Sequence, residues 1–172
     1  RDIAKRREGT KRVVTYMTLG IDVSQLFPDM VMACSTNDVT LKKLIYLYLV
    51  TYAETNAELA ILAINTLQKD ARDEDPMVRG LALRSLSSLG VASVQEYLEP
   101  IVRTLLRDTN SYVRKTAVLA IAKLPIDVEF DLAEIIETDG DWQVVANAVL
   151  VMHERYGAHT KGLGSAPSGQ AP

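Results

Sequence analysis

The sequence predicts an all-α protein in which similar helix hairpins stack on one another, an α-solenoid. Three observations lead to this prediction: a helical motif recurs at near-constant spacing, apolar residues fall at the same offsets in each copy, and turn residues separate the copies. The composition agrees, with 48% hydrophobic and 24% charged residues in a chain of 172. A chain of this length can bury one continuous core.

The recurring motif is clearest in two stretches, "DPMVRGLALRSLSSLG" from Asp75 and "NSYVRKTAVLAIAKLP" from Asn110. Weaker copies begin at Asp38 and Asp141, so the four starts are 37, 35 and 31 residues apart. Each start is Asp or Asn, which can accept hydrogen bonds from the free N–H groups of a first helical turn. Pro76 occupies the first helical position of one copy, where its missing N–H costs nothing.

Three offsets from each start are apolar in all four copies and predict the buried face of each helix. They are offset three (Leu41, Val78, Val113, Val144), offset seven (Ile45, Ala82, Ala117, Ala148) and offset eleven (Leu49, Leu86, Ile121, Met152). Alanine at offset seven in three copies indicates a close helix–helix contact. Gly90 and Pro125 are expected to end their helices.

A second helix is predicted in front of each copy. These partner helices are expected at 24–35, 57–69, 94–107 and 130–137, with 11–20 as the remnant of an earlier hairpin. Hairpins repeating every 31 to 37 residues are close to HEAT and armadillo repeats in period. Tetratricopeptide repeats have a similar period, but their Trp–Leu–Gly–Tyr signature is absent. We therefore expect a HEAT-like solenoid over 11–156, a basic segment at 1–12 and a flexible Gly/Pro/Ser-rich tail at 157–172.

Charge is distributed unevenly along the chain. The net charge of −3 argues against a nucleic-acid binder, yet six of the first 12 residues are basic and two are acidic. Residues 126–141 hold seven acids and no Lys or Arg. The single cysteine, Cys34, excludes an internal disulfide, fits a reducing compartment and is expected to pack as a small apolar side chain. Because the chain begins without methionine, we expect a fragment of a longer protein.

The basic residue at offset four has two interpretations. Lys42, Arg79 and Arg114 occupy this position in the first three copies, and Val145 in the fourth. Clustered cations of this kind can bind phosphate, but in a stacked solenoid they more often pair with the capping acid of a neighbouring repeat. We favour the structural interpretation.

No combination of residues typical of an active site is visible, so neither enzymatic activity nor a cofactor is expected. The two histidines, His153 in a helix and His159 in the tail, are six residues apart and do not share a helix face, which argues against a metal site. Ser87 and Ser88 have no recognisable basic partner. The acids of 70–75 lack the alternating ligands and central glycine of a calcium-binding EF-hand loop and are interpreted as a solvated turn.

The predicted helix at 57–69 has apolar residues on two sides. Leu59, Leu62 and Leu67 share one face, whereas Ile61 lies almost opposite and Ile64 at the flank. Two interpretations stay open. Neighbouring helices cover a wide apolar stripe, or the two isoleucines form an exposed docking patch.

Six segments, in order along the chain, resemble the β-adaptins, the β-type large subunits of clathrin-adaptor-type complexes. They are "YMTLGIDVSQLFPDMV", "LKKLIYLYLVTYA", "LAILAINTLQKD", "DPMVRGLALRSL", "SYVRKTAVLAIAKL" and "VVANAV". The likeness covers about 11–153. "YMTLGIDVS" and "DEDPMVRGLALRSL" are most similar to the β subunit of the fourth adaptor complex, whereas "LFPD" and "YVRKTAV" are nearer those of the first and second.

This resemblance implies a non-catalytic scaffold subunit in vesicle-mediated intracellular protein transport. The implied partners are a second large subunit, a medium subunit, a small subunit and an Arf-type small GTPase. The implied location is cytoplasmic, peripheral on Golgi and endosomal membranes and transport vesicles. No clathrin-box-like segment is visible, so clathrin binding stays open. The alternative is a HEAT scaffold of another class, from nuclear transport or a phosphatase regulatory subunit, against which the segment "KKLIYLYLVTYA" argues.

The resemblance also implies candidate sites on the solenoid surface. The candidates for GTPase docking are Leu47, Ile61 and Ile64. The candidates for contact with phosphoinositide membranes are Lys5, Arg6, Arg7, Lys11 and Arg12.

Overall fold

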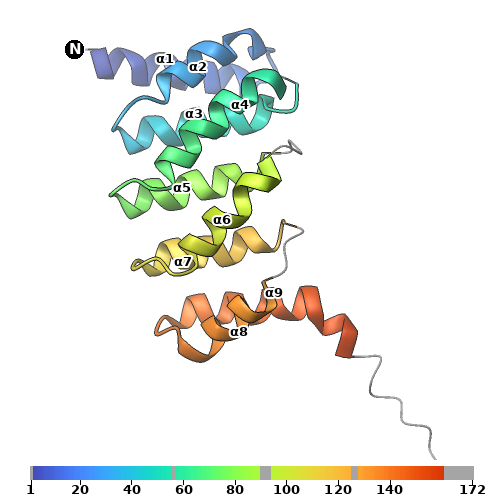
Figure 1. The fold of residues 1–172 in the computed structure, drawn as a ribbon. Coiled ribbons are helices and arrows are strands. Elements are labelled where there is room, and N and C mark those ends of the chain that lie inside the picture. Colours follow the sequence, from blue (N-terminus) through green and yellow to red (C-terminus); the bar gives the residue numbers. More distant parts are fainter. Residues whose placement is uncertain (1, 56, 90–93, 125–127, 161–172) are drawn as a thin grey trace, which may run out of the picture.

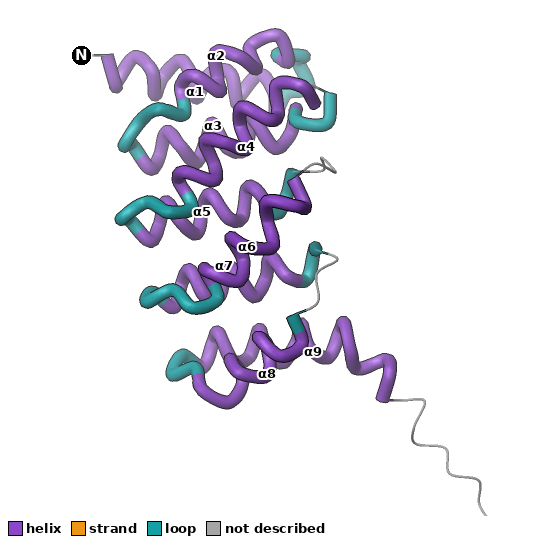
Figure 2. Tube along the Cα trace, viewed as in Figure 1, coloured by secondary structure: helices purple, strands orange, loops and turns teal. Residues whose placement is uncertain are grey.

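The computed structural model describes residues 2–55, 57–89, 94–124 and 128–160. Within these ranges the chain forms helices and loops and no strand (Figure 2). Two layers of helices stack from the N-terminus to α9 (Figure 1). The odd layer holds α1 (Asp2–Thr18), α3 (Val39–Tyr52), α5 (Pro76–Leu86), α7 (Ser111–Ile121) and α9 (Trp142–Thr160). The even layer holds α2 (Phe27–Ala33), α4 (Ala57–Asp70), α6 (Gln95–Leu105) and α8 (Glu129–Thr138).

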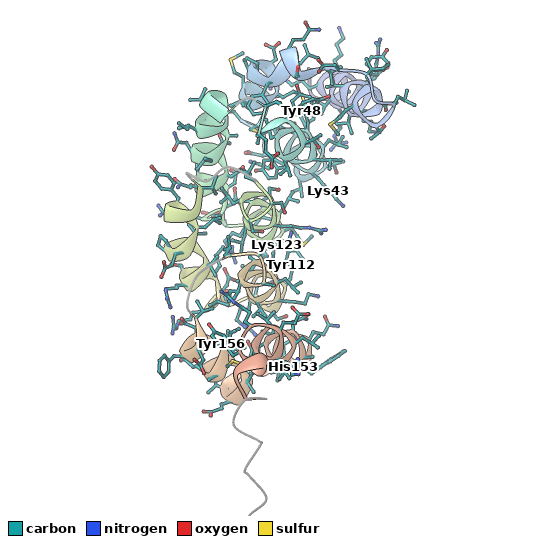
Figure 3. The ribbon with its side chains drawn as sticks, turned by 90° about the vertical axis from the view of Figure 1, so that its right-hand side faces the viewer. Lys43, Tyr48, Tyr112, Lys123, His153 and Tyr156 are labelled. Atoms are coloured by element: carbon teal, nitrogen blue, oxygen red, sulfur yellow. The ribbon has the colours of Figure 1, made fainter. Side chains whose placement is uncertain are left out.

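Turned by 90°, the same stack shows α4 and α6 beside the odd-layer helices, so the molecule is a two-layer slab (Figure 3). Along the odd layer α1 packs against α3, α3 against α5, α5 against α7 and α7 against α9. Even-layer helices pack against the odd helices that follow them, such as α4 on α5 and α8 on α9. This arrangement confirms the predicted all-α solenoid of stacked hairpins.

The four predicted starts cap the odd-layer helices. In each, a side-chain oxygen accepts a hydrogen bond from the backbone N–H two residues later, over 2.8–3.0 Å. The capping residues are Asp38, Asp75, Asn110 and Asp141. Each cap satisfies one of the N–H groups that the first turn of a helix leaves without a partner.

The three predicted offsets form the core of the odd layer. All residues at offsets three and seven are buried, as are Leu49, Leu86 and Ile121 at offset eleven, whereas Met152 is half-buried. The alanines at offset seven, Ala82 and Ala117 among them, are fully buried where successive helices meet. Their small side chains let the helices approach closely.

The N-terminal helices begin and end differently from the prediction. α1 begins at Asp2 rather than at residue 11, so the basic residues from Lys5 to Arg12 are part of this helix. It ends before Gly20, whose φ of 78° is a backbone conformation that glycine adopts at little cost. The predicted helix at 24–35 is a 3-10 turn, Ser24–Leu26, followed by α2. Pro28 in the first turn of α2 has no N–H to donate backwards, which separates the two.

At the other end α9 runs to Thr160 and so includes His159, which was expected in the tail. The rest of the predicted tail, 161–172, lies outside the described residues. Gly90 and Pro125, the predicted helix ends, also lie outside them. The helices concerned, α5 and α7, end at Leu86 and Ile121.

Cys34 packs in the core as predicted. Its side chain is 1% exposed, and burial raises the pKa of its thiol to about 12. Nearby, the hydroxyl of the buried Tyr48 donates a 2.6 Å hydrogen bond to the carbonyl of Val23. The polar end of this aromatic residue is therefore satisfied inside the core.

A prediction concerns Gly80, which faces the ring of Tyr112 where α5 meets α7. A Cβ atom at position 80 would lie 2.4 Å from Cε1 of that ring. We expect Gly80→Ala to lower the free energy of unfolding by about 1–3 kcal/mol, because the ring must leave its packed position. Chemical denaturation measures the change.

The control is Gly9→Ala in α1, where nothing lies within 4 Å of the new methyl group. Higher helix propensity should make this variant slightly more stable, by about 0.5–1 kcal/mol. Equal stability of the two variants would show that Tyr112 moves without cost.

Candidate functional site

The arginines at offset four tie successive hairpins together. Arg79 donates from Nε and Nη2 to the two carboxylate oxygens of Asp108, each over 2.8 Å. Arg114 makes the same bidentate contact with Asp139, over 2.6 and 2.8 Å. In both, Nη1 donates to two backbone carbonyls of the turn before the arginine's own helix. The structural interpretation is therefore correct, and neither guanidinium is free for phosphate.

The acid that pairs with each arginine is not the capping residue, as the sequence had suggested, but the aspartate two positions before it. Asp108 Oδ1 also accepts the backbone N–H of Asn110, and Asp139 Oδ1 that of Asp141, each over 2.8 Å. One carboxylate thus holds both the arginine of the preceding hairpin and the start of the next helix. The recurring pattern of an aspartate two residues before the cap is the sequence signal that could have revealed this partner.

These contacts change the acidity of both aspartates. For Asp139 the hydrogen bond from Arg114 is the main reason that the pKa lies below its usual value. For Asp108 burial alone would raise the pKa, but the hydrogen bonds from Arg79 and from the backbone of Asn110 outweigh it and lower the pKa. Both carboxylates are therefore held in the charged form.

The first copy has a different, more buried contact at offset four. Lys42, 3% exposed, pairs with Asp70 at the end of α4, and Asp70 also accepts a hydrogen bond from the hydroxyl of Tyr46. Burial is the main cause that raises the pKa of the Tyr46 hydroxyl. Asp70 is thus part of the core, which corrects the interpretation of its acidic turn as wholly solvated.

The acidic stretch at 126–141 also turns out to be partly neutralised. Asp131 of α8 pairs with Arg103 of α6 and with Arg107, which lies just after α6. Arg107 also pairs with Glu134 of α8 over 2.8 Å. Arginine from one hairpin and acid from the next therefore meet in both layers.

The membrane candidates lie along α1, and all five side chains are exposed. Among them Arg7 pairs with Asp38, the cap of α3. This hydrogen bond is the main reason that the pKa of Asp38 lies below its usual value. Arg7 is thus a link between α1 and α3, while Lys5, Arg6, Lys11 and Arg12 remain on the outer surface of the helix.

The GTPase candidates do not form one site. Ile61 on α4 is 53% exposed, but Ile64 is 2% exposed and belongs to the core, so the expectation of an exposed isoleucine pair is wrong. The exposed neighbour of Ile61 is Leu62, at 51%, which the sequence had placed on the buried face with Leu59. The side chain of Leu59 lies outside the described residues.

Leu47, the third candidate, is 50% exposed and lines a groove between α3 and α5. That groove belongs to the odd layer, whereas Ile61 belongs to the even layer (Figures 1 and 3). The two exposed candidates therefore lie on separate surfaces.

Among the described residues no group of three or more His, Cys, Asp or Glu side chains is arranged to hold a metal ion. His153 is exposed on α9. No helix in the described part of the chain is long and apolar enough to cross a membrane.

The geometry defines the chain as an α-solenoid whose polar contacts join neighbouring hairpins and whose outer faces carry the candidate residues other than Ile64. Residues 1–161 match the adaptin N-terminal region, and the chain belongs to that family. A homology model of the full-length AP-3 complex in an intermediate open conformation has the same fold, with a TM-score of 0.77 and 22% identity. The match covers 94% of this chain and 30% of that one.

Three relatives show how far the likeness extends. The chain is 48% identical over 158 residues to beta-adaptin-like protein A of Arabidopsis thaliana and 43% over 162 residues to the AP-4 complex subunit beta of Dictyostelium discoideum. It is 42% identical over 164 residues to the AP-1 complex subunit beta-1 of Homo sapiens. The alignments cover 87–90% of this chain but 17–19% of those proteins. AP-4 and AP-1 subunits are almost equally similar, so the fourth complex is not singled out.

We predict that Asp139→Asn lowers the free energy of unfolding by about 1–3 kcal/mol at neutral pH, because Arg114 loses its charged partner. The folded-state pKa of Asp139 is lowered, so this stabilisation is present above the unfolded pKa of about 4 and is lost as pH falls through the folded value. The gap between wild type and variant should therefore shrink in acid.

Urea denaturation near pH 7 and again near about pH 3 measures both stabilities. The control is Glu137→Gln, which removes an exposed carboxylate of α8 two residues before Asp139. A gap that stays constant with pH would contradict the assigned role of the Asp139 charge.

The difference in burial between Ile64 and Ile61 gives a second prediction. Ile64→Asp should unfold the chain or lower its stability by several kcal/mol, because an unpaired carboxylate enters the core. Ile61→Asp should leave the melting temperature almost unchanged. Thermal unfolding followed by circular dichroism compares them, and similar melting of the two variants would refute the assignment of Ile64 to the core.

Proposed function

We propose that the chain is the N-terminal part of the trunk of a β-type large subunit of an adaptor protein complex. There it acts as a non-catalytic scaffold in vesicle-mediated intracellular protein transport. The supporting comparisons are the family match and relatives named as β subunits of the AP-4 and AP-1 complexes, at 43% and 42% identity. The expected partners are a second large, a medium and a small subunit, on the cytoplasmic side of Golgi or endosomal membranes.

The observation that carries a scaffold role is the continuous set of contacts along the stack. Bidentate arginine–aspartate pairs join α5 to the turn before α7, and α7 to the turn before α9. Because one core also runs through the stack, exposed residues on different hairpins keep fixed relative positions. A subunit that binds several partners at once needs this property.

Purification of the full-length protein through an affinity tag, followed by mass spectrometry, tests the proposed function. Large, medium and small adaptor subunits should co-purify in similar amounts. The Ile64→Asp variant, which should unfold or lose several kcal/mol of stability, serves as the control for non-specific capture. Recovery of nuclear-transport or phosphatase subunits in their place would favour the alternative class of HEAT scaffold.

We also propose that the exposed cations of α1 contact anionic membranes containing phosphoinositides. Replacing Lys5 and Lys11 with Gln should weaken liposome binding by roughly tenfold or more, because each cation near such a surface contributes about 1 kcal/mol. The effect should be larger at low salt, since exposed charges are screened at high salt. Co-sedimentation with phosphoinositide liposomes measures it.

The matched control removes two exposed cations elsewhere, Lys69 and Arg72 at the end of α4. Arg7 is left intact in both proteins because it pairs with Asp38. If the control pair lowers liposome binding as much as the α1 pair, the membrane contact is not specific to α1.

For the GTPase the exposed residue Ile61, with Leu62 beside it, is the remaining candidate on α4. We propose that this surface docks an Arf-type GTPase in its GTP form. Ile61→Asp should weaken that complex by about tenfold or more while the chain stays folded, since a buried isoleucine contact contributes about 1.5–3 kcal/mol.

A further inference from the structure

The outer face of the odd layer carries cations without acids along its three central helices, α3, α5 and α7. α3, α5 and α7 together contain six Lys or Arg residues and none of the 22 acidic residues of the chain. One cation of each helix pairs with an aspartate of the stack: Lys42 with Asp70, Arg79 with Asp108, Arg114 with Asp139. The other three cations are not neutralised in this way.

These remaining cations are Lys43, Arg84 and Lys115, and none forms an ion pair with a described residue. Lys43 and Arg84 are exposed, and Lys115 donates to the neutral amide oxygen of Gln143 over 3.0 Å. Lys123, just past α7, is exposed and donates to the hydroxyl of Ser88 over 3.1 Å. Positive charge therefore accumulates on this face of a chain whose net charge is −3.

A groove of about 400 Å³ lies on this face between α3 and α5. Its apolar floor is made by Leu44, Leu47 and Val50 of α3 and by Leu81 of α5. Its polar lining includes Lys43, Arg84, Ser85 and Ser88, and no acidic residue. Lys123, which donates to the hydroxyl of Ser88 in this lining, adds a further cation beside the groove. Lys43 and Lys123 are labelled in Figure 3.

The shape of the groove indicates what fits it. Residues 43–50 of α3 extend for about 10 Å, or two helical turns, along the groove. Two helices lying side by side accept a third helix between them when its apolar ridge enters their groove. Because Leu44, Val50 and Leu81 are only partly exposed, the floor is recessed, which suits a ridge of side chains better than a flat bilayer.

The charges indicate the chemistry of the occupant. Cations at the edges with no acid in the lining attract carboxylates and repel a basic segment. We propose that the α3/α5 groove binds an amphipathic helix of a partner protein, apolar on its inner side and acidic on its flanks. Leu47 is then the central contact of this groove and not part of the surface around Ile61. The proposal does not depend on the identity of the complex that contains the chain.

A displayed peptide library tests the proposal. It consists of helical peptides of about 16 residues, long enough to exceed the groove, with surface positions varied among Glu, Lys, Gln, Leu and Ala. The complete chain selects from it, and the Lys43→Glu/Arg84→Glu variant removes peptides that bind elsewhere. The selected peptides should carry leucines on one face and Glu on both flanks.

A fluorescent copy of the most enriched peptide then measures affinity. Binding should fall at least tenfold with Lys43→Glu/Arg84→Glu and with Leu47→Asp, all of them exposed positions, without a change in melting temperature. The matched control is Ile61→Asp, a similarly exposed position in the even layer, which should bind as wild type does.

Any of four results would overturn the proposal. The library could return Glu and Lys equally on the flanks, or no enriched sequence at all. The enriched peptide could bind the Leu47→Asp variant as tightly as wild type. Finally, the charge-reversed variant could lose binding to phosphatidylcholine vesicles containing phosphatidylserine while peptide selection shows no preference for acid, which would make this face a membrane surface.

Discussion

The arginine–aspartate contact between successive hairpins is the interaction on which the stack depends. A helix hairpin with two apolar sides cannot bury both alone, so it must be held against a neighbour. The apolar surfaces supply most of the stabilisation but have no fixed direction. The bidentate pairs of Arg79 with Asp108 and Arg114 with Asp139 have a defined geometry and fix the register between hairpins. Since the same aspartates accept the backbone N–H of the residue that caps the next helix, the register between hairpins and the start of that helix are set together.

The architecture could be predicted from the sequence alone because the same helix signals recur in each copy of the repeat. Four capping residues and three apolar offsets recur, and almost every one has the predicted environment in the structure. The partners of the arginines were harder to identify, since Asp108 lies 29 residues after Arg79 and either it or Asn110 could have been chosen from spacing. The recurrence of an aspartate two places before the cap is the sequence signal that favours Asp108 over Asn110.

Helical periodicity failed where a helix has neighbours on more than one side. Periodicity gives the angle around the helix axis between Ile61 and Ile64. It does not say which of the two side chains faces the odd layer and which faces solvent. The structure buries Ile64 with Ala63 and Leu67 and leaves Ile61 and Leu62 outside. For the same reason the groove at Leu47 could not be seen in the sequence, because its other wall is α5, more than 30 residues further along. A surface formed by two hairpins can be identified only when the packing of both hairpins is known.

The position of each acid after its arginine also bears on how the protein is made. Arg79 and Arg114 precede Asp108 and Asp139 in the chain, so a ribosome releases the cation first. Until the following hairpin has emerged, the guanidinium has no carboxylate and the odd-layer helix has no neighbour on that side. Each hairpin thus gains its carboxylate partner and its neighbouring helix from the hairpin that follows it. The stack is expected to assemble from the N-terminus, one hairpin at a time, during synthesis.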